Sequence, residues 1–169
     1  MFEKLPDLID PVHCAEHNMR FQARVNQSAM KRLLDQVRQP NGEVEVDIVF
    51  SRHPQLKTPQ FELSVKTDLV LECQRTLEAF VYPVDRQIQG VYVSVMSMAE
   101  DLDEDIEVYE MPEGKVSLLE LVEDEILLAI PMVPRQEGEM LSWQDEAFEE
   151  VELSPADDNP FAKLQDLKK

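Results

Sequence analysis

Apolar and polar residues alternate with a period of two along much of the chain, and this alternation restricts the fold most. "EVEVDIVFSR" (residues 43–52) places its apolar side chains on one side and its carboxylates on the other. "FELSVKTDLVLEC" (61–73) extends the pattern, and "EAFVYPV" (78–84) and "GVYVSVMS" (90–97) add shorter strands. Strands of this kind bury one face and expose the other. Because the connections are short, we predict an antiparallel sheet with one face in water.

Two further segments have the spacing of helices. The first lies in residues 26–42, where Ser28 is suited to cap the helix and a Pro-Asn-Gly sequence to end it. The second, 117–130, begins with Ser117 followed three residues later by Glu120, which is a capping box ahead of an apolar run. A few helices are therefore expected to cover the sheet.

Charge divides the chain into two unequal halves. Residues 1–97 carry 11 basic and 13 acidic residues, a net charge of -2, and residues 98–169 carry 5 and 22, a net charge of -17. We predict one α+β domain over 1–134, whose antiparallel sheet is either open or closed into a barrel. An acidic C-terminal tail follows, with a loosely attached segment at 135–158 and a short amphipathic helix at 159–169 that needs a surface to dock on.

Several classes of function lack their sequence signals. The chain has no glycine-rich phosphate loop, no H-E-x-x-H motif and no nucleophile in a strained turn, so we expect no enzyme. Two cysteines and three histidines do not form a zinc-ligand pattern, so we expect neither a metal nor another cofactor. No window approaches 18 apolar residues, which favours a cytoplasmic protein that does not act at a membrane.

One carboxylate falls on the apolar side of the second helix. Projection at about 100° per residue places Glu125 near Leu118, Leu121 and Ala129. A buried carboxylate needs a partner, and Arg75, at the end of a predicted hairpin, is our candidate. The pair is either structural, or Glu125 is an acid with a raised pKa.

Sparse apolar residues in the acidic half are candidate anchors for a partner. Trp143 and Phe148 lie in the acidic segment, and Phe161 and Leu164 lie on the apolar side of the C-terminal helix. They bind a partner or fold back on the domain, and the sequence leaves both alternatives open.

Three stretches of the chain are "LVLECQRTLEAFVYPV" (69–84), "LLELVEDEILLAIPMVP" (118–134) and "NPFAKLQDLKK" (159–169). In this order they resemble the YceD family of large ribosomal RNA subunit accumulation proteins, a family of unknown biochemical function. The resemblance implies a bacterial cytoplasmic factor for the synthesis, processing or stability of 23S rRNA, without known catalysis. Many members carry C-x-R-C where this chain has Cys73, Arg75 and Thr76. The missing second cysteine again argues against a metal.

Two modes of action fit this resemblance. A net charge of -19 opposes RNA, so the acidic half is expected to bind a basic large-subunit protein, a maturation factor or a pre-ribosomal particle. The alternative is direct RNA binding through a basic face. That face would consist of Arg20, Arg24, Lys31, Arg32 and Arg38.

Overall fold

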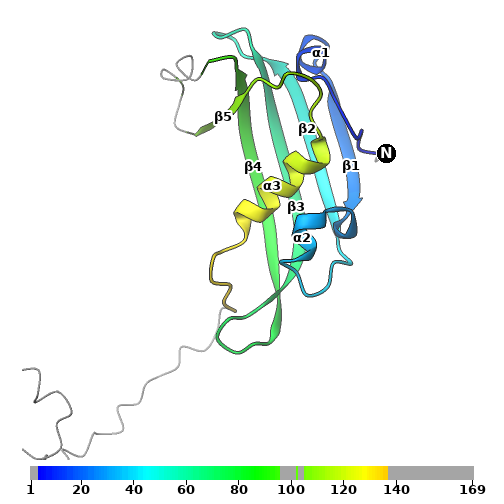
Figure 1. Cartoon of the computed structure of the whole chain (residues 1–169), viewed down its shortest axis with the longest axis vertical. Helices are drawn as coiled ribbons and strands as arrows, with labels where there is room; N and C mark the ends of the chain where they lie inside the picture. The colour runs from blue at the N-terminus through cyan, green and yellow to red at the C-terminus, as the bar shows by residue number, and fades with distance from the viewer. Residues whose placement is uncertain (1–3, 96–101, 103–104, 137–169) are drawn as a thin grey trace, which may run out of the picture. The chain divides into compact units, whose positions relative to one another are not determined.

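The structure, a computed structural model, describes residues 4–95, 102 and 105–136. Within them, five strands form one sheet in which neighbours in space follow the order of the sequence (Figure 1). The strands are β1 (Arg20–Asn26), β2 (Glu43–Arg52), β3 (Pro59–Glu72), β4 (Ala79–Val93) and β5 (Ile106–Glu110). β1 to β4 are antiparallel, whereas β5 runs parallel to β4. The predicted α+β class is confirmed, with a sheet that is mostly antiparallel.

The sheet is open, so the barrel alternative is wrong. Closure requires the first and last strands to pair, but β1 and β5 are the two edges of the described sheet. The predicted acidic segment and the helix at 159–169 lie outside the described residues, apart from Arg135 and Gln136. Those two predictions remain predictions.

β3 and β4 form the long hairpin at the centre of the sheet. The predicted strand at 61–73 and the turn after it are confirmed, with Leu77 at a φ of 62° closing the turn. The two strands predicted at 78–84 and 90–97 are one strand, because β4 pairs with β3 without a break from Gln60 to Glu72. Residues 85–89 therefore continue the alternation instead of interrupting it.

The helix predicted at 117–130 is confirmed as α3 (Leu118–Ala129). The hydroxyl oxygen of Ser117 accepts a hydrogen bond from the backbone N–H of Glu120 at 3.2 Å, which is one of the two hydrogen bonds of a capping box. Among the described residues, no helix is long and apolar enough to cross a membrane.

The helix predicted in residues 26–42 is much shorter than expected. A 3₁₀ turn, η1 (Gln27–Ala29), precedes α2 (Lys31–Leu34), and the side chain of Asn26, not of Ser28, caps the turn. A further helix, α1 (Pro11–Glu16), was not predicted; Asp10 caps it through the N–H groups of Val12 and His13.

The core lies between the helices and one face of the sheet (Figure 1). Buried residues of α1, α2 and α3 join the alternate apolar residues of β2, β3 and β4 in one cluster. Phe50 and Phe61 are its largest fully buried members. We call the other side of the sheet the open face, since no described helix packs against it.

Candidate functional site

The open face is rich in carboxylates. Strand pairing and the alternation of burial assign to it Arg20, Arg24, Lys66, Glu43, Glu45, Asp47, Glu62, Asp68, Glu72, Asp85 and Glu110. Carboxylates thus outnumber cations by eight to three on these strands. The face is acidic even though it carries part of the predicted basic set.

Each cation of the open face is paired with a carboxylate. Arg20 donates from Nε and Nη2 to the two carboxylate oxygens of Asp47, at 2.9 and 2.5 Å, and these hydrogen bonds lower the pKa of Asp47. Arg24 lies 2.7 Å from Glu45. Both arginines would have to leave a carboxylate in order to bind a phosphate.

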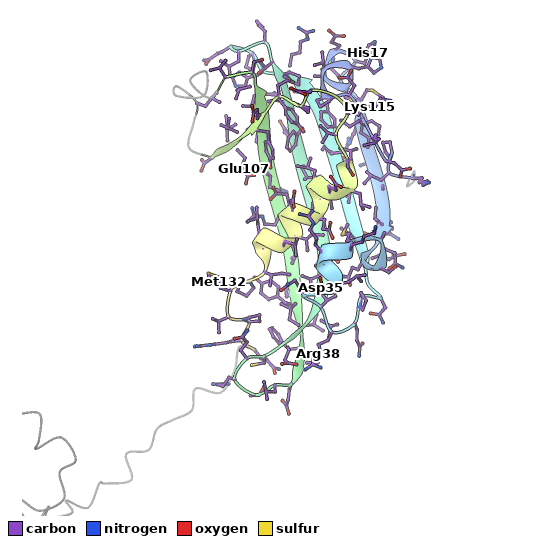
Figure 2. The ribbon with its side chains drawn as sticks, viewed as in Figure 1. His17, Asp35, Arg38, Glu107, Lys115 and Met132 are labelled. Carbon is purple, nitrogen blue, oxygen red and sulfur yellow. The ribbon has the colours of Figure 1, made fainter. Side chains whose placement is uncertain are left out.

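Arg38 and Lys31 lie outside the strands. Arg38 forms an ion pair with Glu72 near the end of β3, at the same end of the sheet as Asp35 and far from Glu107 (Figure 2). Lys31 is exposed, and no carboxylate in the described part of the chain lies within ion-pairing distance of it. Within the described residues, Lys31 is thus the one member of the predicted basic set without an ion pair.

Arg32 has a structural role on the helix side. Its Nη2 lies 3.0 Å from Glu123 Oε2 and its Nη1 lies 2.5 Å from Asp124. Glu123 is 5% exposed and also accepts hydrogen bonds from the backbone N–H groups of Arg32 and Leu33. A carboxylate of α3 therefore caps the first turn of α2. The five predicted cations do not form one face, and their role in RNA binding remains a prediction.

The open face is hollowed by adjoining depressions. One of about 610 Å³ is lined by Arg20, Asp47, Glu62 and neighbouring polar and apolar residues. A second, of about 240 Å³, shares Asp47 with the first, and it shares Lys66 with a third of about 390 Å³. The shared residues make the depressions one shallow trough across the sheet, lined by both charged and apolar residues.

Glu125 is buried, as predicted, and its partners come from two strands. The residue is 1% exposed. Its carboxylate lies 3.3 Å from Arg86 Nη2 on β4 and 3.0 Å from the hydroxyl of Tyr109 on β5. Glu107 lies 2.9 Å from the same hydroxyl and 3.8 Å from Arg86. The cluster ties α3 to the edge of the sheet.

The predicted pair of Arg75 and Glu125 is wrong. Arg75 lies in the turn before Ala79, where β4 begins, and Arg86 lies seven residues further along that strand. At about 3.3 Å per residue the separation is about 23 Å, well beyond the reach of an arginine side chain. The structure gives this position to Arg86.

Two groups of the cluster, Glu125 and Tyr109, have raised pKa values. Burial raises the pKa of Glu125, and the neighbouring carboxylate of Glu107 adds to this, while Tyr109 and Arg86 act in the opposite direction. Burial also raises the pKa of the Tyr109 hydroxyl. The hydroxyl of Tyr109 lies within hydrogen-bonding distance of both Glu107 and Glu125 but has one proton to donate.

Cys73 is a hydrogen-bond acceptor at the end of β3. Its thiol is buried, and hydrogen bonds from the Thr76 hydroxyl and from the backbone N–H groups of Gln136, Thr76 and Arg75 lower its pKa to about 6. The sulfur thereby joins the β3–β4 turn to the segment after α3.

Residues 4–95, 102 and 105–136 contain no group of three His, Cys, Asp or Glu side chains that could hold a metal ion. The expectation that no metal or cofactor is bound remains a prediction.

Trp143, Phe148, Phe161 and Leu164 lie outside the described residues. The structure neither supports nor opposes their predicted role as anchors for a partner.

Sequence reasoning missed Arg86 and Tyr109, although Arg86 left a signal. If the period of two is continued through β4, Arg86 falls on the same face as Val84 and Ile88. A charged residue at a core position implies a buried partner of opposite charge, and Glu125 was such a partner.

Comparisons with known proteins agree with the earlier resemblance. The model of the family "Large ribosomal RNA subunit accumulation protein YceD" matches residues 61–168. The protein of that name from Haemophilus influenzae is 32% identical over 172 residues, which cover 98% of this chain and 97% of the relative. No solved structure matches the chain. The chain therefore belongs to the YceD family.

Proposed function

We propose that the chain supports accumulation of the large-subunit 23S rRNA without catalysis, by holding a basic protein against its acidic surfaces. The partner would be a large-subunit ribosomal protein or a maturation factor. The name of the family supplies the link to large-subunit rRNA. The observation that carries the mode of action is the open face, where each cation is paired and carboxylates remain in excess.

Electrostatics favours a basic partner. The whole chain has a net charge of -19, so it repels the phosphates of free RNA and attracts the lysines and arginines of proteins that bind RNA. Attraction between exposed charges is screened beyond about 8 Å at physiological salt. The partner must therefore lie in contact with the carboxylates, and the trough of the open face offers such contact.

Direct RNA binding is the rival mode. It would require Arg20 and Arg24 to leave Asp47 and Glu45, and Arg32 to leave the buried Glu123. Bases of single-stranded RNA are commonly stacked on exposed aromatic rings, and none of the open-face residues of the described strands is aromatic. We therefore place the basic partner first. A cytoplasmic location is part of the same proposal.

A matched pair of charge reversals tests the function. Glu62→Lys with Asp68→Lys changes the charge of the open face by four units at two exposed positions of β3. Asp7→Lys with Glu113→Lys makes the same change at exposed positions outside the strands. In cells that lack the gene, the ratio of 23S rRNA to small-subunit rRNA is measured for each variant. The open-face variant should fail to restore the ratio and the control should restore it; equal restoration by both would sink the proposal.

A third variant addresses the rival mode. Lys31→Ala with Arg38→Ala removes two predicted RNA-binding cations and leaves Arg32, which holds α2 to α3, intact. The basic-partner proposal expects normal 23S rRNA in this variant. Loss of 23S rRNA here, with a normal ratio in the open-face variant, would favour direct RNA binding.

A further inference from the structure

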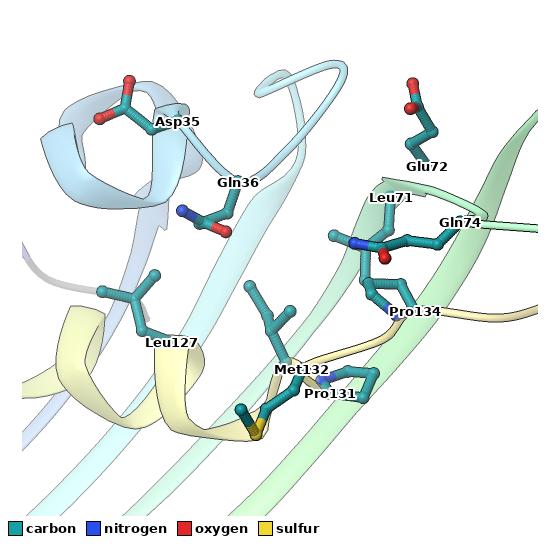
Figure 3. Close-up of a pocket in the computed structure, with 10 residues that line it drawn as sticks. Asp35, Gln36, Leu71, Glu72, Gln74, Leu127, Pro131, Met132 and Pro134 are labelled. Atoms are coloured by element: carbon teal, nitrogen blue, oxygen red, sulfur yellow. The ribbon is translucent and has the colours of Figure 1, made fainter. Parts of the chain in front are cut away.

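A further pocket lies at the C-terminal end of α3 (Figure 3), and Glu72 is the one open-face residue in its lining. Its volume is about 430 Å³. Three segments surround it: residues 35–36 after α2, the end of β3 with the following turn, and residues 127–134. The apolar part of its lining consists of Leu71, Leu127, Ile130, Pro131, Met132 and Pro134. We call it the α3-end pocket.

The surface around this pocket is unusually apolar for an exposed region. Met132, which lines the pocket, is 96% exposed, and Leu128 and Val133 beside it are 68% and 46% exposed. Large exposed side chains gathered within six residues are typical of a contact site rather than of ordinary surface.

The charges of the α3-end pocket favour a cation beside the apolar group. Its lining includes the acidic residues Asp35 and Glu72 and no lysine or arginine. Glu72 is already paired with Arg38, so Asp35 is the acid of the lining that is left for a partner. The C-terminus of α3 carries the negative end of the helix dipole, and its last turn has no basic residue. Pro131, the second residue after the helix, has no N–H to donate.

The wall of the pocket is already in place. The backbone N–H of Gln74 donates to the carbonyl oxygen of Pro134 at 2.9 Å. Cys73 accepts a hydrogen bond from the N–H of Gln136 in the same segment. Residues 131–136 are thus held against the β3–β4 turn, and a ligand need not order this wall when it binds.

We propose that the α3-end pocket receives a large apolar side chain of the basic protein partner, with a neighbouring lysine or arginine of that partner against Asp35 and the end of α3. This rests on the proposed function and adds to it a specific anchor, distinct from the charges of the open face. A nucleic acid fits less well, because the lining has carboxylates, no cations and no aromatic ring for stacking a base.

Two peptides test the anchor on the full chain. Both consist of lysine, arginine and glycine; one has a central leucine and its twin has serine at that position. Binding is measured by fluorescence anisotropy at moderate salt. The leucine peptide should bind about tenfold more tightly, because the pocket buries one leucine side chain.

Variants assign this preference to the pocket. Gln36→Trp fills the pocket from an exposed lining position, and Met132→Ser removes one apolar wall. Either change should reduce the preference for leucine to about twofold or less. Leu8→Trp changes another exposed position, 57% exposed and next to Ile9, which pairs with Val116 ahead of α3. This control should keep the tenfold preference.

The outcomes separate the two proposals. If both peptides bind equally and binding falls in the Glu62→Lys, Asp68→Lys variant, the open face attracts basic protein and the anchor is refuted. If neither peptide binds, the basic-partner proposal fails and the anchor fails with it. A preference for leucine that survives Gln36→Trp places the apolar contact elsewhere and also refutes the anchor.

Discussion

Arg86 should be coupled energetically to Glu125, and Arg75 should not. Arg86→Met keeps the aliphatic part of the side chain and removes the charge that lies 3.3 Å from a carboxylate exposed by 1%. Removal of one partner of a fully buried ion pair costs about 3–5 kcal/mol. Because the Arg86 side chain is 36% exposed, we expect a smaller loss of unfolding free energy, about 2–3 kcal/mol near neutral pH.

A double-mutant cycle isolates the interaction. Glu125→Gln keeps the shape of the side chain and its contact with Tyr109. We expect the loss in the double variant of Arg86 and Glu125 to be smaller than the sum of the single losses by about 1–2 kcal/mol. In the cycle of Arg75→Met with Glu125→Gln, the two losses should add to within about 0.5 kcal/mol, as they do for distant sites.

The cost of Arg86→Met should also depend on pH. The pKa of Glu125 in the folded protein is raised above its ordinary value, so the folded state binds this proton more tightly than the unfolded state does. The contribution of Glu125 to stability is therefore greatest at low pH and falls as the pH rises from the ordinary pKa of a glutamate through the raised one. Loss of Arg86 raises this pKa further, so the variant should be less impaired near pH 5 than near pH 7.

Urea unfolding followed by circular dichroism gives these free energies at both pH values. Coupling of Arg75 to Glu125 as strong as that of Arg86 would refute the geometry described here. The same holds if Arg86→Met and Glu125→Gln add without interaction.

Two further predictions concern packing and the thiols. A Cβ on Gly90 would overlap the ring of Phe61, so Gly90→Ala should lower the free energy of urea unfolding by about 1–3 kcal/mol. In the control Gly114→Ala, no atom lies within 4 Å of the added Cβ, and the free energy of unfolding should change by no more than about 0.5 kcal/mol. Equal effects of the two changes would contradict the packing. In Cys14→Ser, which retains Cys73, thiolate absorbance should titrate with a midpoint at about pH 6. In Cys73→Ser, which retains Cys14, the midpoint should lie above the usual range of a thiol, because burial raises the pKa of Cys14. Since the folded pKa of Cys73 is lowered, its thiolate stabilises the fold in full above the ordinary pKa of a thiol, and this contribution is lost as the pH falls from there to about 6. Coincident midpoints would show that the hydrogen bonds to Cys73 are absent.

The strands were predictable because their alternation is local information. β2 and β3 carry clean periods of two, and the structure places their apolar residues in the core. β4 was divided wrongly because Pro83, Asp85 and Arg86 suggest an interruption, whereas pairing with the long β3 keeps the strand extended. Strand length here depends on the neighbouring strand and not on the local sequence.

The helices show the same limit. α3 was found from its own cap and its apolar side. α2 was overestimated because Met30 and Leu33 are spaced as in a helix, yet both are buried through a 3₁₀ turn and one short helix. The group that caps α2 is Glu123, about ninety residues later in the chain, and no local pattern reveals such a partner.

The site was predictable only in part for a related reason. Helical projection shows that Glu125 is buried, because that depends on its own helix. Its partner depends on which residues of β4 and β5 face α3, and thus on strand register. The acidic character of the open face was hidden because Arg20 and Arg24 are close in sequence, while their carboxylate partners lie on the neighbouring strand.

The central claim is that the acidic open face binds a basic protein and that its link to 23S rRNA is indirect. The most direct measurement is recovery of the tagged protein from gently lysed cells at moderate salt, with and without RNase, for the wild type and for the Glu62→Lys, Asp68→Lys variant. We expect a basic large-subunit protein to remain bound to the wild type after RNase treatment and to be lost from the variant. Loss of every partner from the wild type on RNase treatment, with 23S precursor present beforehand, would contradict the claim.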